Sequence, residues 1–270
     1  MPWIPEVFTA PALQRVLDSR QRDDMVAVPY FDGLIAGDPD ALVASFAGEP
    51  QLHDPVRGRV KGERAFRAYV AAASTWLAQR HATVEDIDHV VLAHRGFEEV
   101  VLHLDGGVDL PFALVADRAR DGLIVELRIY HSCWPLTGRH SIRQPLLQPD
   151  GAVQESDIVG EYQRALAAGD VDAVVATFDP EGYAREPSGG EHVHADLRAF
   201  YEWLFSNGGG IRLEHCSVID DGRACALEYN VVQWGRTELP PQAGISVYVR
   251  GDSGKLVAAR VYDDADPPLA

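Results

Sequence analysis

The chain has 270 residues, of which 46% are hydrophobic and 24% are charged. This composition is typical of folded globular proteins and excludes a disordered or collagen-like chain. Asp and Glu number 41 against 24 Lys and Arg, which gives a formal net charge of −17. That field repels phosphate backbones and anionic lipid headgroups, so neither nucleic acid nor a membrane surface is expected as a partner.

Hydropathy and cysteine content point to a cytoplasmic protein. No apolar run approaches the roughly 20 residues of a membrane-spanning helix, and the first residues show no signal-peptide pattern. Three cysteines, Cys133, Cys216 and Cys225, form no CxxC pair. An odd count without such spacing argues against both a zinc site and a disulfide framework.

The predicted elements occur in the same order in each half of the chain. After an appended amphipathic helix over residues 1–21, each half contains a helix, a helical hairpin, a strand, another helix and several long strands. In the second half Gly169 is predicted to end one helix and Asp170 to cap the next. In the first half Asp38 is the predicted cap, followed by Pro39 at the first helical position. This order indicates an α+β fold.

A stretch near the start of the chain recurs near its middle. Residues 30–55 match residues 162–187 at an offset of 132, and the strand-like segments 121–131 and 253–263 share that offset. The aligned pairs are Tyr30 and Tyr162, Gly37 and Gly169, Asp38 and Asp170, Asp54 and Glu186, Pro55 and Pro187, Arg128 and Arg260, and Tyr130 and Tyr262. Such self-similarity predicts two homologous domains, 22–148 and 149–270, with a boundary in the polar residues 144–157.

Each half resembles a known family. A helix with a Tyr, then AGD, then a helix ending in Phe and a short strand ending in Asp-Pro is similar to the ketosteroid isomerase and SnoaL-like branch of the nuclear transport factor 2-like superfamily. The resemblance implies two repeated cone-shaped domains. Each would be a curved β-sheet wrapped around helices, with a pocket that holds a small hydrophobic molecule.

The resemblance also implies roles for Asp54 and Tyr30. In ketosteroid isomerase the Asp of this Asp-Pro step removes a proton next to a carbonyl, and the helix Tyr donates a hydrogen bond to the resulting oxyanion. Such chemistry needs a carboxylate between apolar walls opposite a dry phenol, and no cofactor or metal. The alternative is that Asp54 is an ordinary turn residue and Tyr30 part of the core.

One departure from the isomerase pattern puts its own reaction in doubt. The family supplies a second oxyanion donor, a protonated Asp, on a late strand. Counting back from the turn glycine places Leu114 and Ser246 at that position. Neither is a carboxylic acid, although proton abstraction, dehydration, cyclisation and epoxide opening remain open on this scaffold.

Strand alternation supplies further candidates. His131 ends a strand on the face shared with Leu127 and Ile129, where it could shuttle protons near neutral pH. Asp263 is the aligned residue of the second half. A histidine at a strand end is also commonly a surface or structural residue.

The second half offers Glu186 in place of Asp54, with Tyr162 again 24 positions earlier. If Glu186, Glu228 and Asp263 converge, one would be an acid and another a base. Alternatively these are separate solvated carboxylates, because Glu228 alternates with Leu227 and Tyr229 and the apolar side can be the one that faces inward. His192 and His194 have an HxH spacing without a third ligand, so no metal site is predicted.

Two functions remain at this point. The first is a cofactor-independent acid–base enzyme of the isomerase, cyclase, dehydratase or epoxide hydrolase type, acting on a small hydrophobic carbonyl or epoxide. The second is a non-catalytic pair of ligand-binding or protein-interaction domains. The two repeats are further expected to pack as an intramolecular pseudo-dimer, and a homodimer of the whole chain stays an open alternative.

Overall fold

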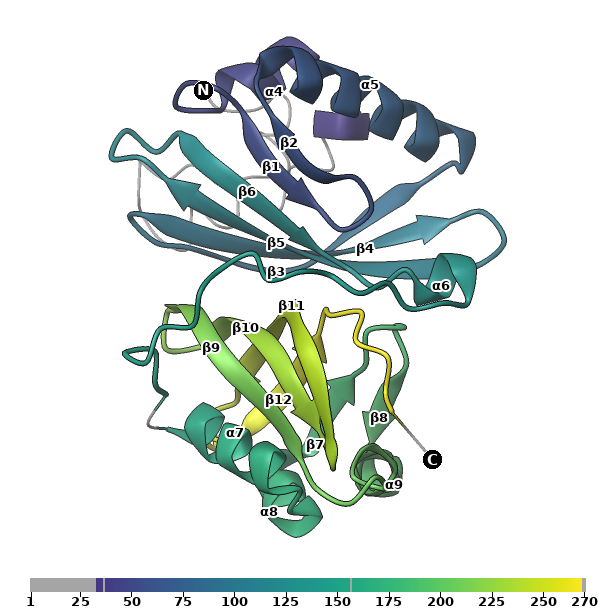
Figure 1. Ribbon diagram of the computed structural model, residues 1–270, viewed down its shortest axis with the longest axis vertical. Helices are drawn as coiled ribbons and strands as arrows, with labels where there is room; N and C mark the ends of the chain where they lie inside the picture. Colours follow the sequence, from purple (N-terminus) through teal and green to yellow (C-terminus); the bar gives the residue numbers. More distant parts are fainter. Residues whose placement is uncertain (1–32, 36, 156, 269–270) are drawn as a thin grey trace. The chain divides into compact units, whose positions relative to one another are not determined.

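The computed structural model describes residues 33–35, 37–155 and 157–268 (Figure 1). Contacts divide the chain into two compact units, one that ends at Tyr130 and one that begins at His131. Each unit combines a curved sheet with helices, which confirms the predicted repeat of an α+β domain. Tyr30 and the helix predicted over residues 1–21 lie outside the described residues.

The first domain is built on a six-stranded sheet with the order β2-β1-β6-β5-β4-β3. β1 and β6 are parallel and the other neighbours are antiparallel. Helices α4 and α5 lie against one face (Figure 1). The strands are β1 (Gln51–Asp54), β2 (Gly58–Lys61), β3 (Thr83–Val91), β4 (Arg95–Leu104), β5 (Val108–Arg118) and β6 (Ile124–Tyr130), and the helices are α4 (Pro39–Ala44) and α5 (Glu63–Gln79).

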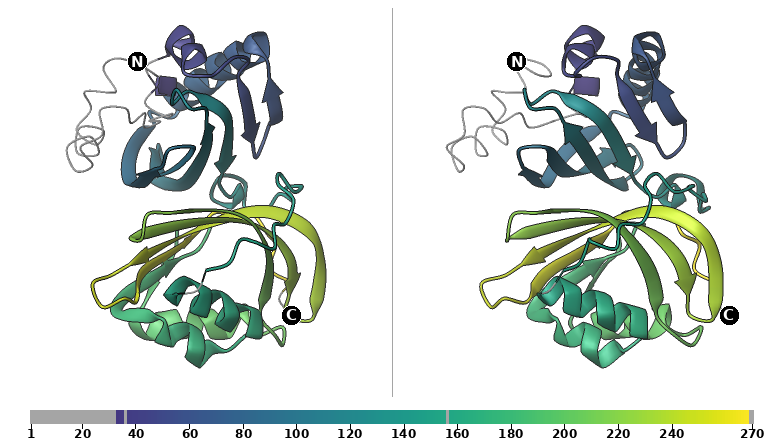
Figure 2. Two further views of the ribbon diagram at one scale, coloured as in Figure 1. Left: turned by 90° about the vertical axis from the view of Figure 1, so that its left-hand side faces the viewer. Right: turned by 60° about the vertical axis from the view of Figure 1, so that its left-hand side comes forward.

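The second domain repeats this topology, with the strand order β8-β7-β12-β11-β10-β9 and a parallel pair β7–β12. Its sheet curves around α7, α8 and α9, which lie on the concave side (Figure 2). The strands are β7 (Phe178–Arg185), β8 (Glu191–Val193), β9 (Ile211–Asp220), β10 (Ala224–Trp234), β11 (Thr237–Arg250) and β12 (Leu256–Val261). The helices are α6 (Trp134–Thr137), α7 (Ile158–Ala168), α8 (Val171–Ala176) and α9 (His194–Leu204).

The helix ends form where capping chemistry predicts them. Gly169 ends α7 in the left-handed conformation, and the Asp170 carboxylate accepts a hydrogen bond from the Ala173 amide at 3.0 Å to begin α8. In the first domain Asp38 accepts from the Ala41 amide at 3.0 Å, followed by Pro39 in the first turn. These side chains satisfy amides that have no partner inside the helix.

The two faces of the second sheet carry different residues because strand side chains alternate. On β10, Leu227, Tyr229 and Val231 face the helices and belong to the apolar core. Asn230 lies on the opposite face, where its side-chain amide donates to the Leu147 carbonyl at 3.1 Å. Alternation places Glu228 on that same outer face.

The connection between the repeats packs on the second domain. The Ala243 amide donates to the Arg143 carbonyl at 3.0 Å, and the Asp150 amide donates to the His215 carbonyl at 2.8 Å. Because these hydrogen bonds hold the segment to β9 and β11, the division by contacts falls before the predicted boundary segment 144–157. None of the helices in the described ranges is long and apolar enough to cross a membrane.

The equivalent glycines Gly169 and Gly37 provide a test of this packing. Both have positive φ, 70° and 68°, but a Cβ on Gly169 would lie 2.7 Å from the backbone at Gly209 and Gly210, whereas one on Gly37 meets no atom of the described residues within 4 Å. Gly37→Ala is expected to lower the free energy of unfolding by about 1 kcal/mol from backbone strain alone. Gly169→Ala should cost about 1–3 kcal/mol more through the steric clash. Urea unfolding of the full chain measures both, and equal losses would contradict this account.

Candidate functional site

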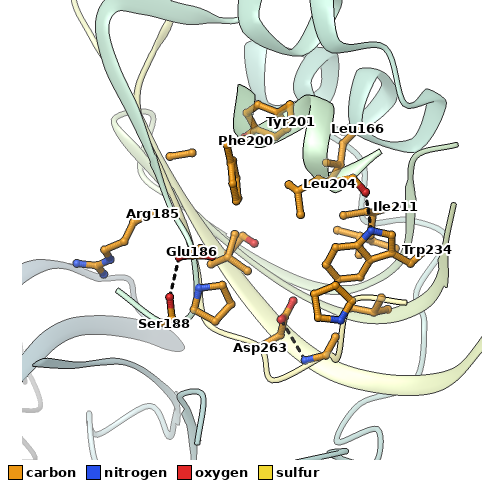
Figure 3. Close-up of a pocket in the computed structure, with 18 of the residues that line it drawn as sticks. Leu166, Arg185, Glu186, Ser188, Phe200, Tyr201, Leu204, Ile211, Trp234 and Asp263 are labelled. Atoms are coloured by element: carbon orange, nitrogen blue, oxygen red, sulfur yellow. Dashed lines mark hydrogen bonds between the residues drawn. The ribbon is translucent and has the colours of Figure 1, made fainter. Parts of the chain in front are cut away.

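A cavity of about 450 Å³ opens in the second domain between the concave face of the sheet and helices α7 and α9 (Figure 3). Its wall is mostly aromatic and aliphatic, and a few hydroxyl and carboxyl groups converge on it. Apolar walls with a few polar groups are typical of small-molecule sites. The lining includes Trp134, His140, Tyr162, Leu166, Glu186, Phe200, Tyr201, Trp203, Leu204, Ile211, Tyr229, Val231, Trp234, Ser246, Tyr248, Val261, Asp263 and Ala265.

Two helix tyrosines share a hydrogen bond in this wall. Tyr162 on α7 and Tyr201 on α9 are buried, and their hydroxyl oxygens lie 2.8 Å apart. The pair has two hydroxyl hydrogens and uses one between them, so one remains for donation to a ligand. Burial raises the pKa of both phenols well above the ordinary value of 10, which keeps them neutral and able to donate.

Asp263 follows β12 and faces the cavity on the same side as Val261. The Tyr229 hydroxyl donates to Asp263 Oδ2 at 3.0 Å, and the Ala265 amide donates to Oδ1 at 3.3 Å (Figure 3 shows Asp263). Gly244 lies opposite Tyr229 in the ladder, and a Cβ there would lie 2.6 Å from the Tyr229 ring and 2.7 Å from Asp263 Cβ. Glycine at this position is therefore what lets the phenol reach the carboxyl.

A chain of hydroxyl groups continues from Asp263 along the sheet. Ser246 Oγ lies 3.1 Å from the Tyr229 hydroxyl and also hydrogen-bonds to Tyr248. The Tyr248 hydroxyl in turn accepts from the Gln163 side-chain amide at 2.6 Å. Connected polar groups of this kind hold one another in place in a low-dielectric interior.

Burial determines the protonation of Asp263. Loss of water from around the carboxyl raises its pKa to about 6, against an ordinary value of 3.8, and the neighbouring Asp264 acts in the same direction. The hydrogen bond from Tyr229 opposes this shift only in part. A carboxyl whose pKa is near 6 can both accept and donate a proton near neutral pH.

Glu186 lies at the edge of the same cavity, just after β7 (Figure 3). Its Oε1 accepts from the Ser188 hydroxyl at 2.7 Å, and His192 Nε2 lies 3.9 Å from the same oxygen. His192 stacks on Phe200 with ring centroids 4.0 Å apart, and its Nδ1 lies 2.7 Å from Asp196 Oδ2. The ionisable side chains of Asp196, His192 and Glu186 thus form a row from the surface to the cavity edge.

The structure brings together three of the residues that the sequence singled out. Tyr162, Glu186 and Asp263 line one cavity. Glu228 lies on the outer face of β10, away from it. His131 is buried, with Nδ1 3.1 Å from the Ser132 carbonyl oxygen, and is not among the residues that line the cavity.

Asp54 has a different environment from Asp263. One of its oxygens accepts from the amides of Val56 and Arg57, at 2.8 and 2.7 Å, and the other accepts from the Tyr69 hydroxyl at 3.0 Å. The amide bonds are the turn arrangement that was one of the two interpretations of this residue. The hydrogen bond from Tyr69, a core residue of α5, adds a third donor to this carboxylate.

The part of the chain that the structure describes contains no group of three or more His, Cys, Asp or Glu side chains that could hold a metal ion. His192 contacts Asp196 and Phe200, as described above. His194 is exposed, with Nε2 3.7 Å from Glu181 Oε2. The two histidines of the HxH segment therefore contact different partners.

Sequence reasoning missed several residues of this site. Tyr248 is not among the predicted residues, although it alternates with Ser246 and therefore faces the same side of β11. Trp134 and His140 come from the connection between the repeats, a segment outside the aligned stretches. The alternation signal could have identified Tyr248, whereas no sequence pattern identifies the other two.

A model of the SnoaL-like domain matches the sequence twice, over residues 27–127 and 159–259. The chain belongs to the SnoaL-like domain family. The expected resemblance and fold are thereby confirmed, and this tandem SnoaL-like chain carries one matched region in each half. No curated protein matches it significantly.

Several solved structures are similar to parts of the SnoaL-like chain at low sequence identity. An NTF-2 like protein of unknown function from Burkholderia xenovorans is 25% identical over 42% of this chain and 84% of its own, with a TM-score of 0.33. A ketosteroid isomerase-like fold protein from Catenulispora acidiphila, in complex with trimethylamine, is 10% identical over 43% and 90%, with a TM-score of 0.36. A putative polyketide cyclase from Sinorhizobium meliloti is 23% identical over 37% and 88%, with a TM-score of 0.31.

The raised pKa of Asp263 predicts how stability changes with pH. The folded chain holds this proton up to about pH 6, whereas the unfolded chain releases it near 3.8. The folded state therefore binds more protons between these values, and the free energy of unfolding falls as pH rises from about 4 to about 6. A shift of this size corresponds to at most about 3 kcal/mol.

Asp263→Asn should abolish this fall in the free energy of unfolding. The variant should therefore be as stable as the wild type near pH 4 and more stable than it near pH 7. Urea unfolding over a pH series measures the difference. Asp266→Asn, which changes an exposed carboxylate in the same loop, serves as the control. An Asp263→Asn variant that is less stable than the wild type at neutral pH would contradict the assignment.

Proposed function

We propose that the second domain is a cofactor-independent acid–base catalyst that acts on a small hydrophobic carbonyl or epoxide compound, with Asp263 as the group that transfers the proton. The observation that carries the proposal is the position of the Asp263 carboxyl, which faces an aromatic cavity and contacts Tyr229. A carboxyl in such surroundings is the usual setting for proton transfer at neutral pH.

For a carbonyl substrate, the ionised Asp263 removes a proton from the carbon next to the carbonyl group. The electron pair of that C–H bond forms an enolate, and the free hydroxyl hydrogen of the Tyr162–Tyr201 pair stabilises the enolate oxygen. Asp263 then returns the proton to another carbon, or to a leaving hydroxyl group, which departs as water. The electron balance requires no oxidant or reductant.

For an epoxide substrate, the protonated Asp263 donates its proton to the ring oxygen as the C–O bond breaks. Glu186, at the edge of the same cavity, accepts a proton from the attacking water or from a hydroxyl group of the substrate. His192 lies between Glu186 and the exposed Asp196, so it provides a route by which that proton reaches solvent.

The second candidate is a binding domain that uses the same cavity without chemistry. The aromatic wall supports it as well as it supports catalysis, because binding needs only the cavity.

Several predictions from the sequence remain hypotheses: Asp54 with Tyr30 as a catalytic pair in the first domain, His131 as a proton shuttle and Glu228 as an acid. The intramolecular pseudo-dimer, a homodimer and the cytoplasmic location also stay predictions.

Turnover separates the two candidates. Wild type, Asp263→Asn, Glu186→Gln and Asp54→Asn would be compared on enones, β-hydroxy ketones, polyketones and epoxides by mass spectrometry with chiral separation. Asp263→Asn is expected to lose about 10²–10⁴-fold in kcat, the usual contribution of a general acid or base. Asp54→Asn changes the residue that aligns with Glu186 in the other repeat, and it should keep full activity because the proposal assigns the chemistry to the second domain. If some compounds raise the Tm of all four proteins equally and none turns over, the binding candidate replaces the enzyme.

The pH dependence of turnover distinguishes the two roles of Asp263. As a base it must be ionised, so kcat/KM should rise with pH and level off above about 6, the pKa of this carboxyl. As an acid it must be protonated, and the rate should fall above the same value. A profile without any change between pH 5 and 7, when chemistry limits the rate, would exclude Asp263 as the proton-transferring group.

A further inference from the structure

The segment Ser132–Ser141 lies between the two matched SnoaL-like regions, yet it contributes two aromatic rings to the cavity of the second domain. The Trp134 and His140 rings stack with centroids 4.7 Å apart and an interplanar angle of 23°. Trp134 remains 44% exposed although it lines the cavity, which places it at the entrance.

Asp264 anchors this segment. Its buried carboxylate accepts from the Ser132 hydroxyl at 2.5 Å, the Cys133 amide at 3.1 Å and the Ser141 amide at 2.7 Å, and His140 Nδ1 lies 3.1 Å away. These donors come from both ends of the segment. A buried carboxylate needs such partners, so their loss would leave an uncompensated charge. The anchor therefore fixes both ends of the segment with the same group.

Hydrogen bonds within the segment add to this anchor. The Trp134 amide donates to the Ser132 hydroxyl at 3.1 Å, and the Gly138 amide donates to the Trp134 carbonyl at 2.8 Å to close α6. Gly138 takes the left-handed conformation that this turn requires, with φ of 63°. These bonds hold the backbone that carries the indole, and the indole itself stacks on His140. Such preorganisation lowers the entropy lost on binding.

We propose that the segment Ser132–Ser141 is a ligand-recognition element, in which the stacked Trp134–His140 pair contacts a flat, conjugated ring of the substrate at the cavity entrance. Trp203, which also lines the cavity and is 45% exposed, supplies a second aromatic surface there. Flat rings gain from offset or edge contacts with such side chains beyond simple burial. The inference rests on the proposed function, since it names the substrate class of the same cavity.

Binding of two probes tests the proposal without knowledge of the substrate. A dihydroxyanthraquinone is flat and conjugated, whereas adamantyl methyl ketone is compact and apolar without a flat ring. Isothermal titration calorimetry would compare the full chain with Trp134→Ala, Trp134→Phe and Leu136→Ala. Leu136 is exposed on α6 and is not among the residues that line the cavity, so it is the matched control.

Trp134→Ala should weaken the affinity for the flat probe about tenfold, which corresponds to about 1.4 kcal/mol of binding free energy. The affinity for the adamantyl ketone should change by less than about twofold. Trp134→Phe should retain most of the affinity, and Leu136→Ala all of it. Equal weakening of both probes, no weakening of the flat probe, or a wild type that binds neither probe would overturn the proposal.

Turnover by Asp263→Asn distinguishes a failure of the recognition proposal from a failure of the proposed catalytic function. If Asp263→Asn abolishes turnover but Trp134→Ala leaves flat-ring binding unchanged, the catalytic proposal stands and the recognition element is wrong. If Trp134→Ala acts selectively and Asp263→Asn leaves turnover unaltered, the recognition element stands and the acid–base role is wrong.

Discussion

The alternation of side chains along β10, β11 and β12 is the constraint on which the rest of the second domain depends. Because neighbouring residues point to opposite faces, one face of the curved sheet turns Tyr229, Ser246 and Asp263 toward the helices. Their neighbours along the strands, such as Glu228 and Arg260, are turned outward. Because the sheet is curved, its inner face forms the wall of a cavity. The position of each residue along its strand therefore decides whether its polar side chain faces this cavity.

Placement of a carboxyl on this wall sets a balance between stability and chemistry. Burial opposes the ionised form of Asp263 and raises its pKa to about 6, and the Tyr229 hydroxyl compensates in part. The folded protein therefore bears a free-energy cost at neutral pH. Costs of this kind are common where a site must hold a group ready to exchange protons.

The two repeats share topology but differ in the local environment of their acidic residues. In the first domain Asp54 accepts two backbone amides of its own turn and one tyrosine hydroxyl. In the second, Glu186 occupies the equivalent position with its side chain beside Ser188. Asp263 follows the last strand, at the position where the first repeat has His131. Duplicated domains that need not perform the same reaction can diverge in this way without loss of the fold.

The sequence alone predicts the repeat, the helix ends and several candidate site residues. It can do so because repeat, capping and turn signals depend on neighbours along the chain. The offset of 132 residues, the Asp caps of α4 and α8 and the glycine end of α7 are of this local kind. So is the choice of Tyr162, Glu186 and Asp263 as candidates.

The tertiary structure alone decided which candidates meet. Glu228 and Asp263 are both carboxylates on predicted strands, and only the direction of sheet curvature puts Asp263 inside. Likewise, Trp134 and His140 reach the cavity through the anchor at Asp264, more than 120 residues later in the chain, and no pattern of neighbours encodes such a contact. Local signals therefore determined the fold of each repeat, whereas long-range packing determined the composition of its site.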